Sequence, residues 1–306
     1  MRISTNEFYQ RAIDQLTNKQ SSVADLQARL ASGKKVLNAS DAPDRAALIL
    51  RLKSAMTQQS NFERNLNAIE DRMTAEESVI SSASDLMQRV RELAVQGSSD
   101  TLGADGRAII AQEVSNLRDE LFNLANQKDA NGNYVFAGSK TSTQPFVDDG
   151  TGQIIYAGDS DRITVNVSEF RQLTINKPGD EVFTAVIRDE NGVETRQSFF
   201  AVLDDFEAAL RNNDSTAISA SFSEIDQVNK GLGLALADTG SRMAAVESQR
   251  GILEETKLRY QTLLSNEEDL DYATAVTELS REMLALEAAQ ASFSKVSQLS
   301  LFNYLR

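Results

Sequence analysis

Hydrophobic residues recur every three or four positions at both ends of this chain. Near the C-terminus one helical stripe contains Val276, Leu279, Met283, Leu286, Gln290 and Phe293. Near the N-terminus a seven-residue spacing links Tyr9, Leu16, Val23 and Leu30, and the same face is widened by Ile13 and Leu26. Such spacing is typical of helices that pair as coiled coils. We therefore expect residues 1–40 and 270–306 to form a terminal coiled-coil assembly domain.

A longer seam follows a helix start signal. Ser40 or Asp41 could cap the helix, and Pro43 suits its first turn. From Leu48 to Ala94 the seam is interrupted only by Gln59 and Glu76, which we interpret as polar positions that set the register of the bundle. Helical spacing recurs after the loop at 97–106 and again from residue 202. We predict a helical rod domain from residues 41–137 and 202–269.

The intervening residues 138–201 have a different texture. They are rich in Gly, Asp and Thr, with short β-branched runs at 154–156, 162–167 and 172–176. These runs predict strands in a small inserted β-rich domain. The predicted fold class is therefore mainly α: an elongated long-helix bundle with paired terminal coiled-coil helices and a small β-rich insertion.

The composition excludes many functions. The net charge of −14 and the pI near 4.6 disfavour nucleic acid and anionic membranes as partners. The absence of Cys and His removes disulfides, thiolate and Ser-His catalysis, and the usual zinc ligands. The first residues lack a basic segment followed by an apolar core, so we expect no cleaved secretory signal. No apolar run approaches the ~18–20 residues of a membrane span.

Candidate chemical sites are weak. Asp129, Asn131 and Asn133 match the first three ligand positions of a calcium loop, but Tyr134 replaces the Gly of its sharp turn. A plain Asn-Gly turn is the better interpretation. The pair Gly231 and Gly233 lacks the third Gly of a phosphate-binding fingerprint. We predict no catalytic, cofactor or metal site, and we interpret most carboxylates as parts of solvated helix faces.

The two ends have too little apolar surface to stabilise themselves. Ordering a residue costs backbone entropy, and two thin helices in water have few apolar side chains whose burial could offset that cost. We therefore expect the ends to be mobile until partners bury them. The last helix supports this expectation because apolar residues spread around it: Val296, Leu299, Leu301, Phe302 and Leu305.

Several segments resemble the flagellin superfamily, and together they span most of the chain outside the insertion. They are LASGKKVLNASDAPDRAA (30–47), residues 95–98, LRDELFNLANQKDANGNYVFAG (117–138), DYATAVTELSREMLALEAAQASF (271–293) and QLSLFNYL (298–305). The last of these is similar to the ending of the superfamily's hook-filament junction branch. The resemblance implies a structural protein of the bacterial flagellum, without enzymatic activity, that links the hook to the filament.

The resemblance also implies location and partners. It implies an extracellular position after export through the flagellar type III channel, a ring of copies between hook-associated protein 1 and flagellin, and an export chaperone on residues 270–306. The implied core-lining contacts are Leu16, Val23, Leu26, Leu30, Leu279, Met283, Leu286, Phe293, Leu299 and Phe302. Two alternatives stay open: a flagellin that forms the filament itself, and a hydrolase that uses carboxylates of the middle domain.

Overall fold

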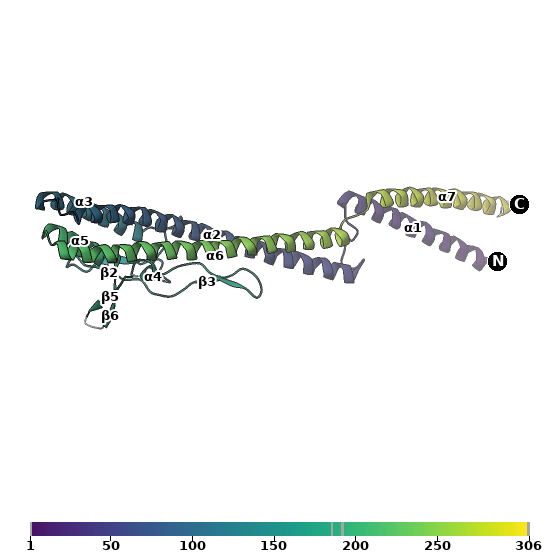
Figure 1. The fold of residues 1–306 in the computed structure, drawn as a ribbon. Coiled ribbons are helices and arrows are strands. Elements are labelled where there is room, and N and C mark those ends of the chain that lie inside the picture. The colour runs from purple at the N-terminus through teal and green to yellow at the C-terminus, as the bar shows by residue number, and fades with distance from the viewer. Residues whose placement is uncertain (1, 185, 191–192, 305–306) are drawn as a thin grey trace. The chain divides into compact units, whose positions relative to one another are not determined.

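The computed structural model describes residues 2–184, 186–190 and 193–304. The side chains of residues 2–6, 8, 189–190, 193–194 and 296–304 lie outside this description. The helices are α1 (Arg2–Ser32), α2 (Pro43–Gly97), α3 (Ala104–Ala125), α4 (Gly179–Phe183), α5 (Phe199–Arg211), α6 (Ser215–Glu268) and α7 (Tyr272–Tyr304). The strands are β1 (Phe146–Asp148), β2 (Ile154–Tyr156), β3 (Thr164–Asn166), β4 (Gln172–Thr174), β5 (Val186–Glu190) and β6 (Val193–Gln197). Figure 1 shows their arrangement.

The ends and interiors of the long helices follow from local sequence, with one correction. The Ala42 carbonyl accepts the first helical hydrogen bond of α2 from Ala46, so Pro43 is the first helical residue. Asp41 was expected to cap this helix, but its carboxylate accepts a hydrogen bond from the backbone N–H of Asn38. Helix α6 continues through four glycines, Gly231, Gly233, Gly240 and Gly251. Each costs about 1 kcal/mol relative to Ala, and the buried side of the helix offsets that cost.

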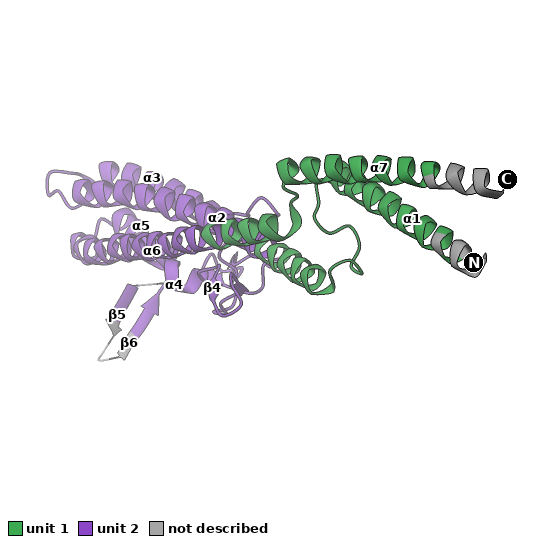
Figure 2. Cartoon of the chain, turned by 90° about the vertical axis from the view of Figure 1, so that its right-hand side faces the viewer, with its two compact units in different colours: residues 1–59, 255–306 green, residues 60–254 purple. Residues whose placement is uncertain are grey.

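The chain divides into two compact units, residues 1–59 with 255–306 (unit 1) and residues 60–254 (unit 2), which Figure 2 colours green and purple. Unit 2 contains the main hydrophobic core. Helices α2, α3, α5 and α6 supply most of it, including Ile80, Val114 and Leu232. An aromatic group where the β-rich segment meets α5 completes it: Phe136, Phe146, Phe183, Phe199 and Phe200.

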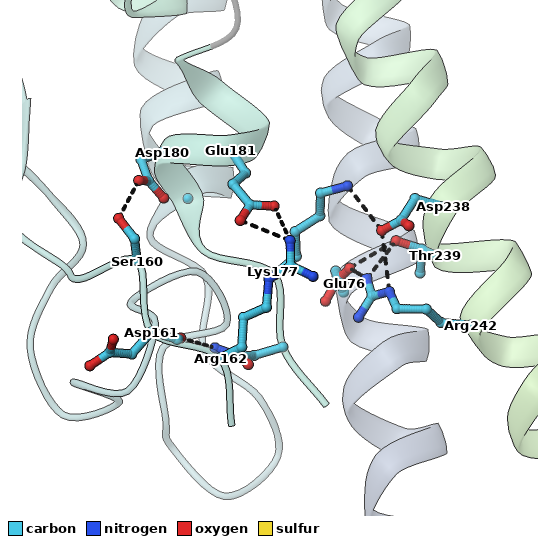
Figure 3. Close-up of polar contacts among 12 residues, drawn as sticks. Glu76, Ser160, Asp161, Arg162, Lys177, Asp180, Glu181, Asp238, Thr239 and Arg242 are labelled. Carbon is cyan, nitrogen blue, oxygen red and sulfur yellow. Dashed lines mark hydrogen bonds and ion pairs between the residues drawn. The ribbon is translucent and has the colours of Figure 1, made fainter. Parts of the chain in front are cut away.

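The β-rich segment consists of separate hairpins. Strands β1–β2, β3–β4 and β5–β6 form three antiparallel pairs, and none of the described strands joins two pairs into a larger sheet. A hairpin alone is marginally stable, so each depends on the helices. Val167, beside β3, is buried in a second core cluster with Phe62 and Val246. Polar contacts reinforce this attachment, because Lys177 pairs with Asp238 of α6 at 3.0 Å (Figure 3).

These features confirm the predicted fold class: mainly α, with long helices, a terminal helix pair and a small β-rich insertion. The two polar interruptions of the α2 seam have different surroundings. Glu76 is fully buried, accepts a hydrogen bond from Thr239 Oγ1 at 2.8 Å and forms an ion pair with Arg242. Gln59, in contrast, is half-buried. Their role in setting register, and the predicted three-domain boundaries, stay predictions.

Candidate assembly surface of the terminal helices

Helices α1 and α7 form a two-helix pair within unit 1 (Figure 2). They are antiparallel, because residues nearer the start of α1 contact residues nearer the end of α7. Lys19 Nζ lies 2.7 Å from Glu282 Oε2. Further along, the rings of Tyr9 and Phe293 meet edge to face with centroids 5.8 Å apart. The two amphipathic ends of the sequence therefore pair with each other, as their spacing allowed.

The pair buries its apolar seam only in part. Of the ten residues predicted to line an assembly, Val23 is buried with 9% of its surface exposed. Six more are half-buried: Leu16, Leu26, Leu30, Leu279, Leu286 and Phe293. Met283 is 43% exposed. The side chains of Leu299 and Phe302 lie outside the described residues. One helix covers only one side of another, so a two-helix pair leaves each seam partly exposed.

A groove lies between the two helices near their free ends. It has a volume of about 320 Å³ and an opening to solvent. Its lining contains two of the predicted residues, Leu16 and Phe293, together with Arg11, Ala12, Gln15, Ala289 and Ser292. The small side chains of Ala12 and Ala289 leave part of the space between the helices unfilled. The groove can therefore accept an apolar side chain from outside the pair.

Sequence reasoning missed part of the exposed apolar surface of unit 1. Leu48 was assigned to a buried seam but is 41% exposed, because the first turns of α2 have few neighbours in this unit. Leu50, Leu258 and Leu263 are also exposed. These three leucines lie outside every predicted seam, and that position in the sequence could have indicated their exposure. On the terminal helices, Ile13, Tyr272, Val276 and Leu284 add to this surface.

Backbone pairing joins the segment after α1 to the segment before α7. The N–H of Lys35 donates to the carbonyl of Glu268, and the N–H of Leu270 donates to the carbonyl of Gly33, both at 2.8 Å. Gly33 has φ +70°, a conformation that favours glycine. Asp271 then caps α7, because its Oδ1 accepts from the N–H of Ala273 at 3.1 Å.

Two lysines bind one carboxylate at this point. Glu268 Oε1 lies 2.8 Å from Lys34 Nζ and 2.9 Å from Lys53 Nζ. Glu268 is the last residue of α6, and only 12% of its side chain is exposed. The hydrogen bonds from Lys34 and Lys53 hold the pKa of Glu268 below its usual value. Residues 266–271, between α6 and α7, thus make specific contacts.

The alternative chemical sites lose support in the structure. Asp129 Oδ1 accepts hydrogen bonds from the N–H groups of Asn131 and Asn133, at 2.9 and 3.0 Å, and its other oxygen faces Arg72. This is the arrangement of a turn. No group of three or more metal-ligating side chains occurs among the described residues. Within the same part of the chain, Asp204 is the carboxylate whose pKa is raised, by burial, and it lies on α5 against Arg118.

Comparisons with known proteins identify relatives of this chain among flagellar proteins. The family of the bacterial flagellin N-terminal helical region matches residues 3–141. Flagellar hook-associated protein 3 of Escherichia coli (strain K12) is 31% identical over 320 residues, which cover 99% of this chain and 99% of that protein. Its counterpart from Salmonella typhimurium is 29% identical with 100% of both chains covered. A flagellin of Listeria innocua is 22% identical and covers 97% of this chain and 96% of its own length.

Solved structures share the fold. The crystal structure of Xanthomonas campestris FlgL matches with a TM-score of 0.64 at 21% identity, over 70% of this chain and 99% of that chain. Flagellar hook-associated protein-3 of Legionella pneumophila matches with a TM-score of 0.65 at 18% identity, over 71% and 98%. At such identities the likeness concerns the fold. Within the described residues, no helix has the length and apolar content needed to cross a membrane.

Proposed function

Because the chain belongs to the family of flagellar hook-associated protein 3, we propose that it is the structural junction protein between the hook and the filament of a bacterial flagellum. The resemblance to the flagellin superfamily that its sequence carries is thereby confirmed. The relatives are structural proteins of the flagellum. The chain therefore acts by binding neighbouring subunits at that location, and we assign it no catalytic role.

One observation carries the proposal. Among its described side chains, unit 1 has four buried hydrophobic residues, Val23, Ile49, Leu52 and Ala275, while many large apolar residues face solvent. Burying such a residue contributes about 1.5–3 kcal/mol. Large apolar side chains left exposed in such number are typical of surfaces that bind other proteins. Unit 1 thus has the surface of a subunit that becomes stable within a larger assembly.

The resemblance to the flagellin superfamily implies the partners, and the exposed apolar surface of unit 1 supports binding to other proteins. We propose that α1 and α7 bind hook-associated protein 1 on one side of the junction and flagellin on the other, within a ring of copies of this chain. The predicted contact residues on these helices supply the apolar faces. Before export, a flagellar chaperone would cover residues 270–306 and keep that apolar helix from aggregating. Export through the flagellar type III channel brings the chain to the extracellular junction without a cleaved signal.

The alternative is a flagellin that forms the filament itself. The flagellin of Listeria innocua is less similar than the two hook-associated proteins, at 22% against 31% and 29%. A seeded polymerisation assay separates the two: a junction protein stays monomeric with filament seeds or added salt, and long filaments would identify a flagellin.

The function is tested by placing charges on the apolar seam of α7. The double variant Leu286→Asp/Phe293→Asp should abolish attachment of filaments to hooks in cells that lack their own copy, as seen by electron microscopy and motility. The melting temperature of unit 2 should change little. The matched control, Ala288→Asp/Ser294→Asp, places the same charges on exposed positions of the same helix and should preserve attachment.

The amount of each variant in the medium separates a failure of export from a failure of assembly. Normal attachment by the seam variant, with normal secretion, would refute the assembly role of α7. A large loss of melting temperature in the purified monomer would show instead that α7 belongs to the core of the molecule.

A further inference from the structure

The turn between β3 and β4 exposes a phenylalanine to solvent. Phe170 is 96% exposed, more than any other exposed large hydrophobic side chain of the residues that the structure describes. A single exposed apolar residue is ordinary on a protein surface. Phe170 differs because the three residues 168–170, which we call the Phe170 turn, are anchored on both sides.

Backbone hydrogen bonds close the Phe170 turn. The N–H groups of Val167 and Ser168 donate to the carbonyl of Arg171, at 2.9 and 3.3 Å. The N–H of Phe170 donates to Ser168 Oγ at 3.3 Å. Val167, which precedes the turn, is fully buried in the core cluster that α2 and α6 supply. The turn is therefore short and anchored at its base.

Side chains also tie the flanks of the turn to α2 and α6. Asn65 Nδ2 of α2 donates to the carbonyl of Asn166 at 2.8 Å. Arg171 Nη1 donates to Oε1 of Gln249, a buried residue of α6, at 3.0 Å. Phe170 is thus presented from an anchored base. A side chain that is held in place before binding loses less entropy when a partner covers it, so Phe170 is suited to anchor a partner.

Unit 2 also has a small groove between α2 and α6. It has a volume of about 250 Å³ and is open to solvent. It is lined by Glu70 of α2 and by Met243, Ala244, Val246 and Glu247 of α6. This α2–α6 groove therefore combines apolar side chains with two carboxylates.

The α2–α6 groove and the Phe170 turn lie on opposite sides of the helix pair. Each residue of an α-helix is rotated by about 100° from the one before it. Glu247 in the groove is therefore about 160° around α6 from Gln249, which holds the turn. On α2, Glu70 is about 140° from Asn65. Val246 lines the groove and belongs to the core cluster beneath the turn, so both features lie at the same level of the pair.

Charges beside the turn and the groove are complementary. Arg171 has no carboxylate partner among the described residues, because its side chain contacts an amide oxygen of α6. Within the same part of the chain, Glu247 forms no ion pair. The second charge of the turn is Glu169, and Arg250, which pairs with Glu70, supplies a cation at the groove. Each charge of the turn thus has an opposite charge at the groove.

We propose that Phe170 of one copy of this chain binds in the α2–α6 groove of a neighbouring copy, with Arg171 facing Glu247 of that neighbour. A chain cannot fill its own groove, because its Phe170 turn lies on the opposite side of the helix pair. Each copy can therefore bind one neighbour on each side. Such contacts form a ring when the rotation between copies closes, and a helix otherwise. The inference rests on the proposed ring of copies and names residues of unit 2 that would join them.

The contact is small. One aromatic side chain and one or two ion pairs bury far less than the roughly 1,200 Å² of a stable complex. The free chain is therefore expected to stay monomeric in dilute solution, and the contact forms where an assembly holds copies side by side. Tethered neighbours reach effective concentrations of about 1 mM, which is sufficient for weak contacts to form.

The test traps the contact in the purified full chain at about 1 mM. The chain has no native cysteine, so Glu169→Cys/Ala244→Cys places one thiol beside Phe170 and one in the groove. Oxidation with copper phenanthroline should link copies into dimers and longer covalent chains, with the 169–244 disulfide identified by mass spectrometry. The matched control, Glu169→Cys/Ser219→Cys, has its second thiol exposed on the same helix about 38 Å away and should give little product.

Two further variants, made in the trapping pair, identify the groups responsible. Phe170→Ser should slow formation of the 169–244 disulfide at least about tenfold, the effect of withdrawing one buried aromatic side chain. It should leave the melting temperature unchanged, because Phe170 is exposed in the single chain. Glu247→Arg should also slow trapping, and Arg171→Glu/Glu247→Arg should restore it. Equal yields from the two cysteine pairs, or trapping that Phe170→Ser does not slow, would overturn the contact.

Filament attachment in cells reports separately on the proposed function. Specific trapping in the purified chain, with no attachment of filaments by the parent chain, would contradict only the proposed function. Normal attachment by the parent chain without specific trapping would contradict only the contact between copies. If Phe170→Ser then still prevented attachment, Phe170 would bind a different protein, such as flagellin, and the groove of a second copy would be excluded as its site.

Discussion

Glu76 lies in the middle of α2 with its side chain fully buried, opposite Arg242 and Thr239 of α6 (Figure 3). Replacing it with alanine would remove the carboxylate and leave the guanidinium of Arg242, which is 17% exposed, without its buried partner. Breaking a buried ion pair in this way costs about 3–5 kcal/mol, because the remaining carboxylate contact of Arg242 is with the half-exposed Asp238, at 3.3 Å. Arg242→Met should be at least as harmful, since it leaves the more deeply buried charge alone.

The structure also predicts a compensating change. In Glu76→Met/Arg242→Met both charges are gone, and no neighbouring polar group loses its last partner. Thr239 Oγ1 keeps its hydrogen bond to the carbonyl of Ala235 at 3.1 Å, and Asp238 keeps Lys177 at 3.0 Å. Hydrophobic replacements of buried pairs are often neutral or stabilising. We therefore expect the double variant to be close to the parent chain in stability, in contrast to either single variant.

Differential scanning calorimetry measures this directly. For a unit of 195 residues (60–254), 1 kcal/mol shifts the melting temperature by about 2–4 °C, so each single variant should melt roughly 6–20 °C lower. Glu92→Ala is the control, because its pair with Arg89 is exposed and Arg89 keeps Glu113. Single variants that melt like the control, or a double variant as unstable as the sum of the singles, would refute the reasoning.

Three further outcomes are expected. Leu232→Ala, in the core of unit 2, should lower the free energy of unfolding by about 2–5 kcal/mol, whereas Leu286→Ala, half-buried on α7, should cost clearly less by urea titration. Gly33→Ala should destabilise the chain by roughly 1–2 kcal/mol, because φ at Gly33 is +70°. Gly251→Ala, in open space on α6, should stabilise it by about 0.5–1 kcal/mol. Equal shifts in melting temperature for the two variants would contradict this. Burial raises the folded-state pKa of Asp204 above 3.8, so its contribution is greatest below that pH and is lost as the pH rises through the folded value. Relative to Asp204→Asn, the parent should therefore lose stability on moving from pH 3.5 to pH 6, and a constant difference would show that burial does not govern this group.

Local sequence indicated the long helices of this protein, but not the short α4, which lies in the segment predicted to be β-rich. Helical periodicity depends only on residues three and four apart, so the seams predicted α1, α2 and α7 within a few residues. The same pattern singled out Glu76 as a polar interruption. Composition removed the chemistry that needs Cys or His, and the segments at both ends indicated the family. The short strands were harder, because three-residue runs such as β1 carry little periodic signal.

The tertiary structure alone decided which distant residues meet. Nothing near Glu76 in the sequence indicates that Arg242 pairs with it, and nothing near Glu268 indicates Lys34 and Lys53. Periodicity shows which face of a helix is apolar, but not how much of that face another helix covers. That is why Leu48 and Met283 belong to predicted seams and yet remain exposed. Burial depends on how many helices surround a position: several surround it in unit 2, whereas α1 and α7 have mainly each other.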